Sequence, residues 1–138
     1  MNRICWRATA AFFAATFAAF AAAQIRDANF PLEETWSLRD INDKPIPAGI
    51  KATLKIDGNL RGSGFAGCNS WSAKLKPLKD QHLQIGPIAL TMMQCSDDIM
   101  AVESGFLSAL AGSPTWDIVN GDLVIKGPNG SLRLARSP

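Results

Sequence analysis

The feature that most constrains the fold is a glycine-rich segment at residues 62–71, which reads Gly-Ser-Gly-Phe-Ala-Gly-Cys-Asn-Ser-Trp. Sequence in which apolar and polar residues alternate lies on either side of it. Glycine inside a strand pattern indicates a bulge, a bend or the close approach of another chain segment, and glycine also accepts positive φ. We therefore predict a bent, closely covered strand with Cys68 held at its centre.

The first 23 residues have the pattern of a secretory signal peptide. Arg3 and Arg7 precede an uncharged run at residues 8–22 that is mostly Ala and Phe, and three alanines ending at Ala23 form a small-residue cleavage site. The alternative is a membrane anchor, but this run of 15 residues is shorter than the ~18–20 that a spanning helix needs. We predict cleavage after Ala23 and a periplasmic or secreted protein.

We divide the chain into a signal peptide at 1–23, a flexible leader at 24–34 and one domain at 35–136. The mature chain would be long enough to bury a core of its own. Cleavage removes two of the 14 basic residues, which leaves 12 against 12 acidic ones, so the net charge falls from +2 to 0. A neutral chain without a basic run does not favour nucleic acid as a partner. No segment after the signal peptide is apolar enough to span a membrane.

Two cysteines, Cys68 and Cys95, remain after cleavage. An even pair in an oxidising compartment predicts one disulfide. Such a bond would stabilise the fold by about 3–4 kcal/mol in the chain-entropy description. The alternative is two separate buried thiols.

Short alternating runs bounded by turn residues predict strands. They lie at residues 35–41, 50–56, 60–71, 83–90, 116–119, 123–125 and 132–134. Trp36, Leu38 and Ile41 would face the core in the first run. The second and third runs would form a hairpin, and Asn120-Gly121 predicts another. Residues 72–81 are polar and lysine-rich, which predicts a solvated loop or a sheet edge.

One helix is predicted after Cys95. Ser96 is a suitable N-terminal cap, and two aspartates follow it. Apolar residues then recur at spacings of three and four until Gly112 and Pro114, namely Ile99, Val102, Phe106, Leu107 and Leu110. Strands at short spacing with one late helix indicate an antiparallel α+β domain.

The sequence around these elements resembles the META domain family, which includes the HslJ-like heat-shock proteins. Residues 64–69 are similar to its G-x-x-G-C-N motif, residues 83–95 to L-x-I-x-x-I-A-x-T-x-M-x-C, and residues 103–110 to E-x-x-F-L-x-x-L. Trp71 and Lys74 depart from the Gly/Tyr pattern that usually follows G-C-N. The matching motif residues are Gly64, Gly67, Cys68, Asn69, Thr91, Met93, Cys95 and Glu103. The resemblance implies a small antiparallel β-barrel-like sheet covered by one α-helix, an envelope or stress-associated role, and no assigned catalytic activity.

Residue types that carry catalysis or bind metals are scarce. A nucleophilic Cys68 would need a base or a positive environment, and the only histidine of the sequence, His82, has no sequence relation to it. Two cysteines and one histidine fall short of a structural metal site. The G-x-G-x-x-G at 62–67 lacks the helix that a dinucleotide site requires. We therefore expect no enzyme activity, no catalytic residue, no metal and no cofactor.

Two functions remain open. We expect a secreted domain that acts in envelope maintenance or stress tolerance by binding a protein or another envelope component. The alternative is a carrier or sensor of a small apolar ligand such as an acyl chain, because small barrels can hold a ligand. Its pocket would be lined by Phe65, Trp71, Met92, Met93, Met100 and Trp116, although core packing is the simpler explanation of these residues.

Overall fold

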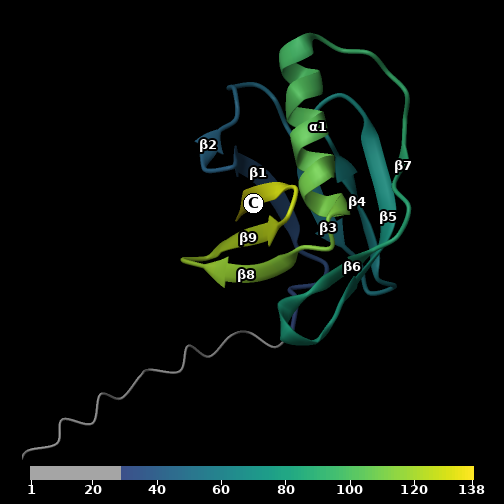
Figure 1. Ribbon diagram of the computed structural model, residues 1–138, viewed down its shortest axis with the longest axis vertical. Coiled ribbons are helices and arrows are strands. Elements are labelled where there is room, and N and C mark those ends of the chain that lie inside the picture. The colour runs from purple at the N-terminus through teal and green to yellow at the C-terminus, as the bar shows by residue number, and fades with distance from the viewer. Residues whose placement is uncertain (1–28) are drawn as a thin grey trace, which may run out of the picture.

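The structure is a computed structural model that describes residues 29–138 (Figure 1). The predicted signal peptide at 1–23 and the first residues of the predicted leader lie outside the described residues. Within residues 29–138, no helix combines the length and the apolar character that crossing a membrane requires.

Antiparallel strands form one sheet that is almost closed on itself. Eight strands follow the order β6-β5-β4-β3-β1-β10-β9-β8, while β2 pairs with β1 and β7 pairs with β5. The strand bounds are β1 Thr35–Ile41, β2 Lys44–Pro45, β3 Thr53–Ile56, β4 Arg61–Phe65, β5 Ser70–Pro77, β6 Leu83–Ile85, β7 Ala89–Leu90, β8 Thr115–Val119, β9 Asp122–Gly127 and β10 Gly130–Arg136. The two ends of the sheet meet where the Leu83 N–H donates to the Pro114 carbonyl at 2.9 Å.

Helix α1, Asp97–Ala111, packs against β10, β9 and β1. Apolar side chains fill the space between the strands and the helix, and the largest fully buried ones are Trp36, Leu54, Ile56, Leu75, Leu83, Phe106, Leu110, Leu123, Ile125, Leu132 and Leu134. The predicted fold class, an α+β domain with an antiparallel barrel-like sheet and a covering helix, is confirmed.

Both predicted hairpins are present. Strand β3 pairs with β4, and β8 pairs with β9 around Asn120-Gly121. Both of these turn residues have positive φ, 53° and 86°, as expected for the two-residue turn whose twist matches that of the flanking strands.

A β-bulge explains the spacing of the core residues in β1. Trp36 and Leu38 are buried two residues apart, but the next core-facing residue is Ile41. The pairing of β1 with β10 shifts by one residue between Leu38 and Asp40. An extra residue in one strand reverses the faces beyond it, so Ile41 points inward as predicted.

The prediction for residues 72–81 is wrong over most of its length. Residues 70–77 form β5, which lies inside the sheet between β4 and β6. Trp71, Ala73 and Leu75 are buried, whereas Lys74 and Lys76 are exposed. Period-two alternation is therefore the correct signal here, and the lysines mark the outer face of a strand.

The packed part of the chain begins a few residues earlier than the sequence predicts. Phe30, which the sequence assigns to a flexible leader, is buried and its ring lies 5.0 Å from that of Trp116. Glu33 donates its backbone N–H to Ile56 and forms an ion pair with Lys55. Residues 30–33 therefore belong to the domain.

The start of α1 lies where predicted, but Ser96 does not cap it in the predicted way. The Ser96 hydroxyl hydrogen-bonds the Asp98 carboxylate, and no backbone N–H of the helix binds the Ser96 side chain. This hydroxyl, together with the Ile99 N–H, lowers the pKa of Asp98.

Candidate functional site

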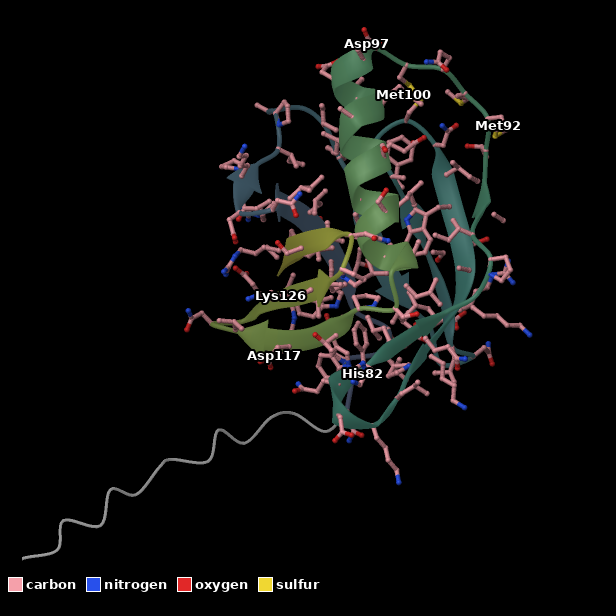
Figure 2. All side chains as sticks on the ribbon, in the orientation of Figure 1. His82, Met92, Asp97, Met100, Asp117 and Lys126 are labelled. Carbon is pink, nitrogen blue, oxygen red and sulfur yellow. A yellow bond between two sulfur atoms is a disulfide. The ribbon has the colours of Figure 1, made fainter. Side chains whose placement is uncertain are left out.

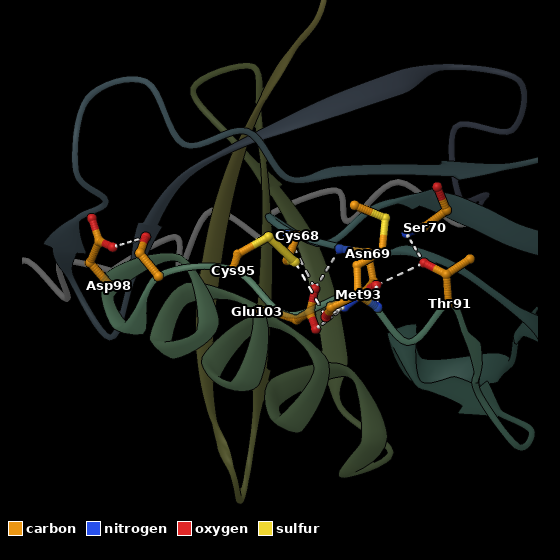
Figure 3. The surroundings of a disulfide bond; sticks show 9 residues. Cys68, Asn69, Ser70, Thr91, Met93, Cys95, Asp98 and Glu103 are labelled. Atoms are coloured by element: carbon orange, nitrogen blue, oxygen red, sulfur yellow. Dashed lines mark hydrogen bonds between the residues drawn. A yellow bond between two sulfur atoms is a disulfide. The ribbon is translucent and has the colours of Figure 1, made fainter.

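A disulfide joins Cys68, in the connection between β4 and β5, to Cys95, just before α1 (Figure 3). Their Cα atoms are 5.9 Å apart, and the predicted pairing is confirmed. Because Cys68 is bonded to Cys95, it is not a free thiolate. The bond also indicates a compartment outside the reducing cytoplasm.

A buried carboxylate lies beside the disulfide. Glu103 projects from the inner face of α1 and is only 4% exposed. One of its oxygens accepts the backbone N–H groups of Cys68 at 3.2 Å and Asn69 at 2.7 Å. Its other oxygen accepts the Asn69 side-chain amide at 2.9 Å. A buried carboxylate is costly unless it is hydrogen-bonded, and these three donors compensate it.

The side chain of Asn69 connects this carboxylate to the segment that precedes α1. Asn69 is 2% exposed. Its amide nitrogen donates to the Met93 carbonyl at 3.0 Å, and its oxygen accepts the Met93 N–H at 2.6 Å and the Thr91 hydroxyl at 2.9 Å. The side-chain amide therefore binds both the N–H and the C=O of Met93, as the backbone of a paired β-strand would. This use of both donor and acceptor groups requires an amide rather than a carboxylate.

Two glycines allow the β4–β5 region to come this close. A Cβ atom on Gly64 would lie 2.0 Å from the Thr53 carbonyl oxygen, so β3 excludes any side chain there. Gly67 has a φ of 115°, and a Cβ on it would lie 3.4 Å from the Ile99 carbonyl oxygen of α1. The predicted close covering is confirmed, with β3 on one side and the helix on the other. The prediction of one bent strand over residues 60–71 is wrong, because β4 ends at Phe65 and the chain reverses through residues 66–69 into β5, so Cys68 lies in a turn between two paired strands.

Together these contacts hold an extended segment at residues 91–96, which we call the strap. Thr91 is bound to Ser70 through its N–H and its hydroxyl, each at 3.1 Å. Met93 is bound by Asn69, and Cys95 is bound by the disulfide. The strap is thus attached at every second residue along one side of the domain (Figure 3).

The strap presents two methionines to solvent. Met92 is 92% exposed and Met93 is 62% exposed, more than any other large apolar side chain among the described residues. Phe65, at the end of β4, is also exposed, and its neighbour in the sheet is Ser70, to which Thr91 is bound. Met100 projects from the first turns of α1 toward the strap (Figure 2). Apolar side chains therefore gather at the disulfide end of the molecule.

The structure does not bring the six residues of the predicted apolar pocket into one cavity. Trp71 and Trp116 are buried in the core, whereas Phe65, Met92 and Met93 are exposed and Met100 is half-buried. The two tryptophans border different surface grooves, one beside β7 and one over β8 and β9.

The motif residues, in contrast, lie together. Cys68 and Cys95 form the disulfide, and Glu103, Asn69, Thr91 and Met93 are joined by hydrogen bonds. Gly67 packs against the helix beside them, and only Gly64 lies apart, against β3. A role for Glu103 could have been found in the sequence, because it occupies the apolar side of the helix three residues before Phe106. A carboxylate at such a position requires buried donors.

Other polar candidates lie apart from this site. His82 is exposed near the opposite end of the molecule (Figure 2). Within residues 29–138, no group of three or more His, Cys, Asp or Glu side chains could hold a metal ion.

The family model of the META domain matches residues 29–138. The chain belongs to the META domain family. This META domain is also similar to two solved structures, which support the fold alone. One, described as the NMR structure of the protein from Burkholderia xenovorans, is 24% identical with a TM-score of 0.62 and covers 77% of this chain and 83% of its own. Another NMR structure is 19% identical with a TM-score of 0.62 and covers 74% of this chain and 87% of its own. A comparison with curated proteins gives no match.

Proposed function

We propose that this META domain is a non-enzymatic binding module of the cell envelope, which holds a protein partner or another envelope component at the strap and contributes to envelope maintenance or stress tolerance. The observation that carries the proposal is the exposure of Met92 and Met93 on a segment that is fastened by a disulfide and by Asn69.

Exposed apolar side chains on a fixed backbone favour binding. Methionine adapts its shape to different apolar partners and recurs on protein-binding surfaces. The backbone of the strap is already ordered by its attachments, so a partner would lose little additional conformational freedom on binding it.

The polar groups of the site favour a structural rather than a catalytic role. Cys68 is in a disulfide, and Glu103 already accepts three hydrogen bonds. A general base needs access to a substrate proton, and Glu103 is buried behind the strap. These features support binding without catalysis.

The proposed export and stress role are supported by observations other than the exposed methionines. The signal-peptide pattern at residues 1–23 and the disulfide agree with an envelope location. The stress role follows from the resemblance to HslJ-like proteins. An apolar-ligand carrier has less support, because core side chains fill the interior and the six expected lining residues are dispersed.

The test is complementation of a deletion strain under envelope stress. We expect the wild-type chain to restore growth and the double variant Met92→Asp/Met93→Asp to fail. The matched control is Leu78→Asp, which changes a side chain that is 43% exposed and lies away from the strap. All three proteins should be exported in equal amounts and melt within a few degrees of one another.

Three results would contradict the proposal. One is full complementation by the double variant. Another is retention of all three proteins in the cytoplasmic fraction. The third is a native mass spectrum in which the purified wild-type protein carries a stoichiometric lipid, which would favour the carrier.

A further inference from the structure

The strap and the helix that follows it carry acidic side chains but no basic ones. The sequence contains no Lys or Arg between Lys79 and Lys126, a stretch that includes β6, β7, the strap and all of α1. Asp97 and Asp98 lie at the start of α1, and both are exposed. Figure 2 shows Asp97 at the same end of the molecule as Met92 and Met100. Exposed carboxylates therefore adjoin the exposed methionines.

The solvent-exposed face of α1 carries only small side chains after its first turn. These side chains are Ala101, Ser104, Ser108 and Ala111. Small side chains permit the close approach of another backbone. A bulky apolar group held by Met92 or Met93 could therefore extend over α1 without meeting a long side chain.

We propose that the partner of the strap is a protein segment that carries both apolar and basic side chains, an inference that rests on the proposed function. Its apolar groups contact Met92, Met93 and Phe65, and its lysines or arginines approach Asp97 and Asp98. Complementary charge suppresses wrong partners and steers the encounter, while the methionines supply apolar contact area.

The same charges disfavour two other occupants. An anionic lipid surface would be repelled by Asp97 and Asp98 and would find no basic residue on the strap or on α1. In a symmetric dimer that used this surface, the acidic groups of the two copies would face one another. A basic segment alone matches both the apolar and the charged groups.

The experiment is an NMR titration of the ¹⁵N-labelled protein with synthetic probes. The first probe is an amphipathic helical peptide of leucine and lysine, and the second is the same peptide with glutamate in place of lysine. We expect the lysine peptide to shift the amide signals of the strap and the first turn of α1, and to bind at least about tenfold more tightly than the glutamate peptide.

Variants separate the apolar and charged contributions. Met92→Gln/Met93→Gln and Asp97→Asn/Asp98→Asn should each weaken binding of the lysine peptide by about fivefold or more. Leu78→Gln and Asp43→Asn change an exposed apolar and an exposed acidic residue elsewhere, and should leave the affinity unchanged. Added salt should weaken the wild type more than the Asp97→Asn/Asp98→Asn variant.

Each contrary result has a distinct meaning. Equal or tighter binding of the glutamate peptide at the strap would overturn the basic partner and leave the proposed function intact. Absence of strap shifts with either peptide would overturn both. Preferential binding to phosphatidylglycerol vesicles, or sedimentation as a dimer that Met92→Gln/Met93→Gln dissociates, would replace the basic segment by lipid or by a second copy.

Discussion

The two ends of the barrel satisfy their buried polar groups in different ways. At the disulfide end, Glu103 and Asn69 take part in six hydrogen bonds, to each other, to the Cys68 backbone and to the strap. At the other end, the Gln81 side-chain oxygen and the Trp116 indole N–H are buried without a partner in the protein. The adjoining residues Asp80 and Gln81 both have positive φ, 56° and 59°.

This difference indicates where the domain is rigid. Satisfied polar networks specify one arrangement, whereas unsatisfied groups and left-handed non-glycine residues reduce local stability. The end that holds the strap is therefore the better determined one, and the end around η1, Lys79–Gln81, should open first. The predictions below test this contrast, from the largest expected effect to the smallest.

Removing the buried carboxylate should have the largest effect. Glu103→Ala leaves three buried donors without an acceptor, and we expect a loss of about 3–5 kcal/mol of unfolding free energy. Glu103→Gln should lose less, because one oxygen can still accept. Urea unfolding measures both, with the exposed neighbour Ser104→Ala as the control that stays within about 0.5 kcal/mol. A Glu103→Ala midpoint equal to that of the control would contradict the role assigned to this network.

Removing the disulfide should have the next largest effect. Cys68→Ser/Cys95→Ser should cost about 3–4 kcal/mol, because the denatured chain regains the freedom of a long loop. Thermal unfolding should show the same loss when the wild type is reduced. Reduction should leave the double variant unchanged, and a further loss in that variant would show that the reductant acts elsewhere.

An amide-to-carboxylate exchange tests the hydrogen-bond assignment within the network. Asn69→Asp removes the donor to Met93 and places a second carboxyl beside Glu103, so we expect a cost of about 2–3 kcal/mol at neutral pH. Like charge and burial raise the folded-state pKa of the introduced carboxyl above its unfolded value. The neutral form is therefore favoured by folding, and the cost should shrink as the pH falls below that folded-state pKa. A cost that does not change between pH 7 and pH 4 would contradict this assignment.

The smallest expected effect has the opposite sign and lies at the other end. Asp80→Gly relieves a left-handed residue at an exposed position, and should raise stability by about 0.5 kcal/mol. The matched change at the disulfide end, Gly67→Ala, should lower it by about 1–2 kcal/mol. Calorimetry should show a higher melting temperature for Asp80→Gly and a lower one for Gly67→Ala. Shifts of the same sign in both variants would contradict the proposed difference between the two ends.

Most of the fold could be predicted from the sequence because its local signals agree with one another. The Asn120-Gly121 turn, the paired cysteines and the apolar spacing of the helix each predict what the structure contains. Strand β5 was missed because its lysines were interpreted as loop composition, although Trp71, Ala73 and Leu75 alternate with them.

The candidate site could be predicted only in part. The motif identified Asn69 and Glu103 as related positions, but their hydrogen bonds depend on how the helix crosses the β4–β5 connection. Nothing in the composition of Met92 and Met93 distinguishes a surface residue from a core residue. Their exposure follows from the way the strap is attached. Thr91, Met93 and Cys95 are bound to residues 68–70, which lie more than 20 positions earlier in the sequence.

The pairing of β1 with β10 also determines when the domain can be completed. The first and last strands are neighbours in the sheet, and β10 lies between β1 and β9. During synthesis, β1 and β9 therefore both lack the strand that joins them until residues 130–136 have been made. Pairing between segments so far apart in the sequence forms slowly. The sheet can therefore be completed only after the last strand has been synthesised, and any step that needs an unfolded chain has until then to take place.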